Sequence, residues 1–136
     1  MRAPDLQAAK LMEEKIASLR KEGNSAGGII ECVAKGVSAG LGEPVFDKLD
    51  ALLGQALFSI GAVKAVEIGS GIHAGTVTGS RNNDQYAAGP DGKAVKLTNH
   101  AGGILGGISD GSDLHIKVTF KPTPSIGKEQ QALYRD

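Results

Sequence analysis

The chain has 136 residues, which suits one domain that buries about two-thirds of the surface exposed by its unfolded chain. Its 15 basic and 15 acidic side chains cancel, which argues against a broad nucleic-acid-binding face. A single cysteine excludes an internal disulfide, and the sequence contains no apolar run of about 18 residues that would span a membrane. We therefore expect a cytoplasmic protein that binds neither nucleic acid nor membranes.

The first half of the chain predicts two helices separated by a strand. After Pro4-Asp5, a typical helix start, apolar residues recur at spacings of three and four, at Leu6, Ala9, Met12, Ile16 and Leu19. The apolar run 29–34 predicts a strand, and a loop follows at 38–42. A second helix is predicted from Pro44, with an apolar face that runs from Phe46 to Ile60.

The second half predicts mainly strands. A short strand is expected at 63–68, and the turn-rich stretch 69–92 contains a short strand candidate at 76–78. Another short strand is expected at 93–97. Strict alternation of apolar and polar residues over 114–121 predicts a half-buried strand that Pro122 ends. This order of elements favours an α+β layer fold in one domain that covers residues 1–136.

Two other patterns give weak signals. Gly69–Gly75 resembles a dinucleotide-binding turn, but β-branched and turn residues follow it where that motif requires a helix. His73, His100 and His115 lack the spacing of metal ligands, and Cys32 stands alone. We therefore expect no metal site, and we assign no catalytic nucleophile or base.

Asn99–Gly111 carries two glycine pairs within ten residues. Missing side chains allow a ligand or another chain to approach the backbone closely, as a flat aromatic ring requires. A glycine-rich turn without a ligand explains the composition equally well.

The segment Lys121–Ser125 offers one cation, two hydroxyl groups and two rigid prolines. A lysine and hydroxyl groups are suitable partners for a phosphate. Taken alone, the segment is more simply a solvated exit from the alternating strand.

Taken together, six blocks in this order resemble the chorismate synthase family. They are residues 2–5, 23–28, 36–50, 59–69, 99–111 and 121–125. The resemblance implies a layered β-α-β sandwich, of which this chain forms one partial repeat, in a homotetramer. It also implies a lyase of the shikimate pathway that converts 5-enolpyruvylshikimate 3-phosphate to chorismate with reduced FMN. The FMN-binding positions that it implies are Gly61, Ala62, Gly106, Lys121, Pro122, Thr123, Pro124 and Ser125.

The sequence also departs from the family pattern. Gly61 replaces a larger residue, and Asn24, Ser38, Phe58 and Ser70 replace other common family residues. The family portions that carry the proton-transfer histidines, most substrate arginines and a catalytic aspartate have no counterpart here. We therefore expect an internal segment that carries part of the FMN site and is inactive alone. The alternative is a noncatalytic α+β module that serves folding or oligomerisation.

Overall fold

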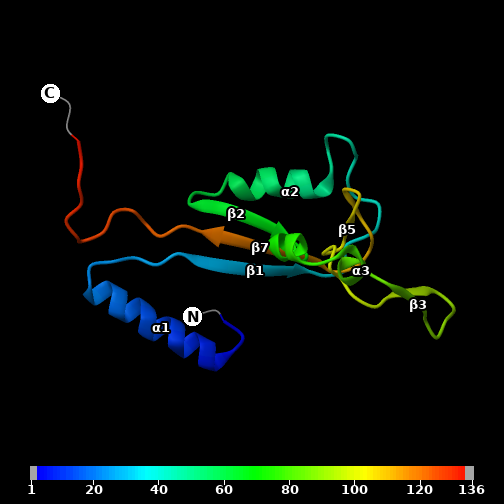
Figure 1. Cartoon of the computed structure of the whole chain (residues 1–136), viewed down its shortest axis with the longest axis horizontal. Helices are drawn as coiled ribbons and strands as arrows, with labels where there is room; N and C mark the ends of the chain where they lie inside the picture. The colour runs from blue at the N-terminus through cyan, green and yellow to red at the C-terminus, as the bar shows by residue number, and fades with distance from the viewer. Residues whose placement is uncertain (1–2, 134–136) are drawn as a thin grey trace. The chain divides into compact units, whose positions relative to one another are not determined.

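The computed structural model describes residues 3–133, which form two compact units (Figure 1). One unit contains residues 3–28 and 121–133, and the other contains residues 29–120. Within the described residues, no helix combines the length and apolar character needed to cross a bilayer.

The first unit is built on helix α1, Leu6–Lys21. Asp5 caps its start, because one carboxylate oxygen accepts the amides of Gln7 and Ala8 at 2.8 and 3.0 Å. Gly23, with φ of 65°, turns the chain at the end of the helix, where the Asn24 amide donates to the Leu19 carbonyl at 2.8 Å. The predicted first helix is confirmed.

The second unit is built on a three-stranded sheet in the order β1-β7-β2. The strands are β1 at Gly28–Ala34, β2 at Val63–Ile68 and β7 at Leu114–Phe120. β2 and β7 are antiparallel, with Val66 opposite Val118. The arrows of β1 and β7 also run in opposite directions in Figure 1.

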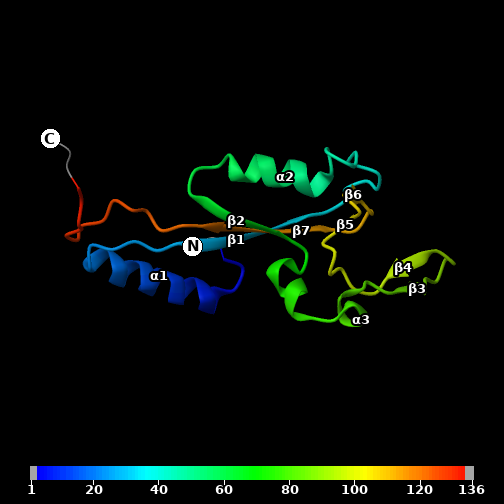
Figure 2. The same cartoon turned by 45° about the horizontal axis from the view of Figure 1, so that its top comes forward.

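Helix α2, Leu49–Phe58, covers one face of this sheet (Figure 2). Val63, Ile116 and Val118 form the buried centre, and Leu53 and Leu57 of the helix pack against it. The polar residues of β7 lie on the opposite face, where Lys117 faces Glu31 at 3.9 Å. The alternation predicted for 114–121 is thereby confirmed.

Smaller elements lie between β2 and β7. They are the 3₁₀ helix η1 at Gly71–Thr76, the short helix α3 at Gly79–Asn82, the hairpin of β3 (Tyr86–Ala88) with β4 (Ala94–Lys96), and the hairpin of β5 (Ile104–Leu105) with β6 (Ile108–Ser109). The short strand expected at 93–97 is confirmed as β4.

Two predicted elements differ from the structure. The strand candidate at 76–78 is wrong, because Thr76 donates its hydroxyl to the His73 carbonyl at 2.8 Å and belongs to η1. The second helix begins at Leu49 rather than after Pro44. Glu43 and Asp47 exchange backbone hydrogen bonds of 2.7 and 3.0 Å, which close a loop before the helix and leave Phe46 90% exposed.

The buried centre of the sheet gives a direct stability test. Replacing Ile116 by Ala should lower the free energy of unfolding by about 2–4 kcal/mol, because it opens a cavity against α2. The control is Lys117→Ala, whose side chain is 45% exposed on the other face and should change the free energy by less than about 1 kcal/mol. Urea unfolding measures both, and equal losses would contradict this assignment of the two faces.

Candidate functional site

The glycine-rich run forms the β5–β6 hairpin, and Gly106-Gly107 is its two-residue turn. Both turn residues have positive φ, 60° and 88°, as a tight type I′ turn requires. Gly106 is exposed, and among the described residues no heavy atom beyond its chain neighbours lies within 4 Å of the position where a Cβ would stand. Its backbone is therefore open to a ligand.

Three other glycines of the run, Gly102, Gly103 and Gly107, are buried against protein atoms. A Cβ on Gly102 would collide with the backbone of Gly69. A Cβ on Gly103 would lie 2.7 Å from the Asp113 carbonyl oxygen, and one on Gly107 would lie 2.5 Å from Lys48 Cγ. These glycines permit close packing of the chain, which separates their role from that of Gly106.

Ser109 attaches the hairpin to the loop 38–42. Its side chain is buried, with the residue 3% exposed, and its hydroxyl donates to the Ser38 carbonyl at 2.6 Å. The same hydroxyl oxygen accepts the Leu41 amide at 2.9 Å. At the turn, the Leu49 amide donates to the Gly107 carbonyl at 2.7 Å, so the first residue of α2 also holds the hairpin.

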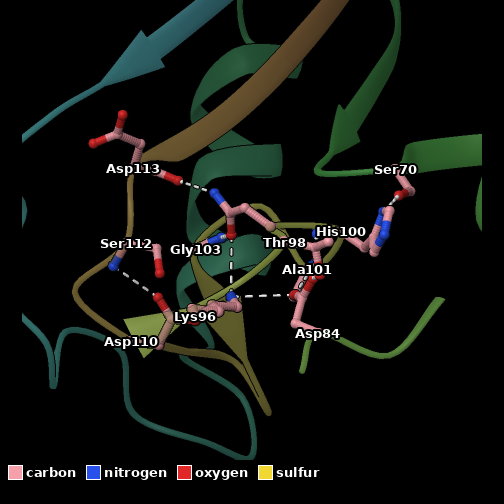
Figure 3. Close-up of polar contacts among 11 residues, drawn as sticks. Ser70, Asp84, Lys96, Thr98, His100, Ala101, Gly103, Asp110, Ser112 and Asp113 are labelled. Carbon is pink, nitrogen blue, oxygen red and sulfur yellow. Dashed lines mark hydrogen bonds and ion pairs between the residues drawn. The ribbon is translucent and has the colours of Figure 1, made fainter. Parts of the chain in front are cut away.

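A charged cluster lies at the base of the hairpin (Figure 3). We call the four residues Asp84, Lys96, Asn99 and Asp110 the Lys96 cluster. Lys96 Nζ lies 3.2 Å from Asp84 Oδ2, 2.6 Å from Asp110 Oδ2 and 3.1 Å from Asn99 Oδ1. The Lys96 side chain is 9% exposed, so these partners replace most of its water.

Asp84 also binds the start of the glycine-rich run. Its two carboxylate oxygens accept the amides of His100 and Ala101 at 2.6 and 3.0 Å, and the Thr98 hydroxyl donates to it at 2.7 Å. Burial by itself would raise the pKa of Asp84, but these hydrogen bonds and Lys96 outweigh burial and hold the pKa well below its usual value.

The pKa values of Asp110 and Lys96 also shift, each in the direction that favours the charged form. Burial opposes the charge of Asp110, but the Lys96 ammonium and the Ser112 amide lower the pKa of Asp110. Burial also opposes the charge of Lys96, yet hydrogen bonds and attraction to Asp110 and Asp84 raise the pKa of Lys96. All three groups are therefore charged at neutral pH.

Gly61 and Ala62 lie in the turn from α2 to β2 and are both exposed. Ala62 has φ of 72°, a conformation that costs a non-glycine residue free energy and is often found at functional sites. The hairpin turn contacts the other end of α2, at Leu49. A ten-residue helix is about 15 Å long, so the structure does not bring Gly61 and Ala62 next to Gly106.

The segment Lys121–Ser125 lies in the first unit and is exposed throughout. The Ser25 hydroxyl donates to the Thr123 carbonyl at 2.7 Å, and the Gly127 amide donates to the Gly23 carbonyl at 2.8 Å. A groove of about 350 Å³ lies beside these contacts and is lined in part by Arg20, Asn24 and Ser125. A common cleft for this segment and Gly106 stays a prediction.

Two histidine side chains contact hydroxyl groups. His100 Nδ1 lies 3.3 Å from the Ser70 hydroxyl, and His73 Nδ1 lies 3.0 Å from the Thr76 hydroxyl. Across residues 3–133, no three His, Cys, Asp or Glu side chains gather in a way that could hold a metal ion.

Sequence reasoning missed Asp84, Lys96 and Ser109. Asp84 and Lys96 lie in a polar, turn-rich stretch where charged residues are ordinarily solvated. The one available signal is a pair of opposite charges, Lys96 before the glycine-rich run and Asp110 near its end, and the meaning of this pair depends on tertiary contacts.

Comparisons with known proteins agree with this architecture. A family model described as "Chorismate synthase" matches residues 1–136. A chorismate synthase from Lachnoclostridium phytofermentans is 56% identical over 130 residues, which is 96% of this chain and 35% of that protein. One from Methanosarcina mazei is 56% identical over 133 residues, 98% of this chain and 36% of that protein.

A solved structure, "Crystal Structure of Chorismate Synthase", superimposes with a TM-score of 0.83 at 32% identity, over 89% of this chain and 37% of that chain. These likenesses confirm the predicted α+β fold class. The chain belongs to the chorismate synthase family. It spans about a third of the length of the curated relatives that it matches.

The two kinds of glycine should respond differently to a methyl group. Gly106→Ala should cost about 1–2 kcal/mol, from positive φ alone. Gly102→Ala has the same backbone cost and in addition meets Gly69, so it should cost at least about 1–3 kcal/mol more. Thermal and urea unfolding compare the two variants, and a Gly106→Ala loss as large as that of Gly102→Ala would refute the distinction.

Lowering the pH should reduce the contribution of the Lys96 cluster to the free energy of unfolding. Asp110 has a lowered pKa in the folded chain, so its ionic contribution is complete above the unfolded-state pKa, about 3.9, and is lost as the pH falls through the folded value. We expect the stability difference between the natural chain and Asp110→Asn to be constant near neutral pH and to shrink below about pH 4. Urea unfolding along a pH series tests this, and a difference that widens in acid would contradict it.

Proposed function

We propose that this chain supplies part of the FMN site of a chorismate synthase. The observation that carries the proposal is the exposure of Gly106. The other glycine of the same turn, Gly107, is packed against protein, and both lie in a segment that matches the family model. A planar ring can approach the backbone only where a side chain is absent. Gly106 meets that requirement, and the surrounding hydrogen bonds keep it in place.

The residues present also fit the polar part of FMN. Lys121 can neutralise a phosphate, and the hydroxyl groups of Thr123 and Ser125 can donate to its oxygens. Pro122 and Pro124 reduce the number of conformations that the segment loses on binding. Its backbone is already held, because the Thr123 carbonyl accepts the Ser25 hydroxyl.

The reaction that we propose for the complete enzyme is the elimination of phosphate and a hydrogen from 5-enolpyruvylshikimate 3-phosphate, which gives chorismate. Reduced FMN supplies transient electron density to this elimination, and the protein supplies orientation and charge. The role of this chain is to hold the cofactor through Gly106 and Lys121–Ser125, with Gly61 and Ala62 as a further contact. We place the enzyme in the cytoplasm, as a homo-oligomer.

The proposed role predicts that phosphate recognition depends on Lys121. The chain should bind reduced FMN more tightly than riboflavin, which lacks the phosphate. Lys121→Ala should weaken FMN binding by about tenfold or more and leave riboflavin binding unchanged, because a hydrogen bond between charged groups contributes about 1.5–3 kcal/mol. Lys128→Ala removes a nearby lysine outside the segment and should change neither. Anaerobic calorimetric titration measures all of these affinities.

Failure of the natural chain to bind FMN at about 100 µM would mean that the 136-residue chain has no working site. We further expect no chorismate formation by this chain alone, because the family's proton-transfer groups have no counterpart in it. Measurable turnover would overturn that expectation.

A second candidate role, association without catalysis, is favoured by exposed apolar side chains. Three apolar residues of the single strand β1 are exposed: Ile29 at 67%, Ile30 at 59% and Val33 at 41%. Large exposed apolar residues mark interaction surfaces when they are contiguous. Sedimentation separates the two roles: a stable oligomer that forms regardless of flavin, with no flavin binding, favours the noncatalytic module.

A further inference from the structure

The base of the β5–β6 hairpin is closed by two residues that both bind Lys96. Asn99 Oδ1 accepts the Gly103 amide at 2.9 Å, and the Asp110 amide donates to the Gly103 carbonyl at 3.0 Å. Both polar backbone groups of Gly103 are thus held by Asn99 and Asp110. The Lys96 ammonium lies 3.1 Å from Asn99 Oδ1 and 2.6 Å from Asp110 Oδ2.

The hairpin needs such support because each of its strands has only two residues. An isolated two-stranded hairpin is marginally stable in water even when it is longer. The direction of the Gly106-Gly107 turn therefore depends on what holds its base and its tip. Leu49 acts at the tip, Ser109 acts on the outer strand pair, and the Lys96 cluster acts at the base.

We propose that Lys96 is a positioning residue for the Gly106-Gly107 turn. It acts through Asn99 and Asp110, and it does not touch the ligand. The consequence for flavin binding rests on the proposed function, whereas the consequence for the hairpin does not.

The remaining hydrogen bonds of Asp84 and Asp110 show which of the two carboxylates would be more disturbed by the loss of Lys96. Without its ammonium, Asp84 and Asp110 are two largely buried carboxylates with side chains 4% and 12% exposed. Asp84 keeps three donors, from Thr98, His100 and Ala101. Asp110 keeps the Ser112 amide, at 2.8 Å. The disturbance should therefore fall on Asp110, which is the side of the cluster that closes the hairpin.

The first test measures the hairpin without any flavin. Amide hydrogen exchange, followed residue by residue by NMR, compares the natural chain with Lys96→Met. The control is Lys93→Met, which removes an 83%-exposed lysine from the turn between β3 and β4. We expect exchange of the Gly103 and Asp110 amides to rise about tenfold or more in Lys96→Met. Exchange of the Glu67 and Lys117 amides, which face each other in the β2–β7 ladder, should change by less than about twofold, and Lys93→Met should leave all four unchanged.

Asp110→Asn provides the same test if Lys96→Met does not fold, because it keeps the side-chain shape and removes one charge. Exchange at Gly103 within about twofold of the natural chain in every variant that folds would overturn the proposal. An equal rise at Gly103 and in the β2–β7 sheet would also overturn it, because Lys96 would then support the whole unit rather than the hairpin.

The second test titrates FMN and riboflavin into two single variants, Lys96→Met and, for comparison, Lys121→Ala. A positioning role predicts weaker affinity in Lys96→Met for both FMN and riboflavin, by about the same factor, because the ring and not the phosphate meets the hairpin. A loss confined to FMN would contradict it. If the natural chain binds no FMN but the exchange pattern appears, the proposed function fails for this chain and the positioning role stands.

Discussion

The ion pairs of Lys96 with Asp84 and Asp110 are the interactions on which the glycine-rich hairpin depends. Three chain segments meet at this ammonium: Asp84 lies before β3, Lys96 is the last residue of β4, and Asp110 follows β6. Because the group is largely buried, the pairs cannot be exchanged for water without a large loss of free energy. The result is a rigid base beneath a turn that would otherwise be too short to keep one conformation.

The glycines of this hairpin have different roles. Gly102, Gly103 and Gly107 are buried and allow neighbouring backbone or side chains to approach, so they belong to the scaffold. Gly106 is exposed and belongs to the surface that a ligand can reach. Neither the sequence nor the backbone conformation separates these roles. All four glycines lie in one continuous run, and all four have positive φ. Their separation supports the proposal that Gly106 contacts the cofactor.

The parts of the fold that sequence predicted are those that depend on local periodicity. The alternation along β7 predicted its buried face, and the spacing along α1 predicted that helix. The predicted start of α2 was wrong because the spacing of apolar residues does not reveal the backbone pairing of Glu43 with Asp47. Lys96 and Asp110 are fourteen residues apart, and only the tertiary fold joins them. The proposed flavin contacts came from resemblance to the family, and no residue pattern would have singled out Ala62.

The proposed function assigns both Gly106 and Lys121–Ser125 to cofactor binding, and the two segments belong to different units of this chain. The central claim is that one flavin contacts both segments. The most direct measurement is an NMR titration with FMN that follows backbone amides across the chain. The account predicts that the amides of Gly106, Gly107, Thr123 and Ser125 shift together and saturate with one dissociation constant. Shifts in only one of the two segments, or saturation at clearly different concentrations, would contradict it.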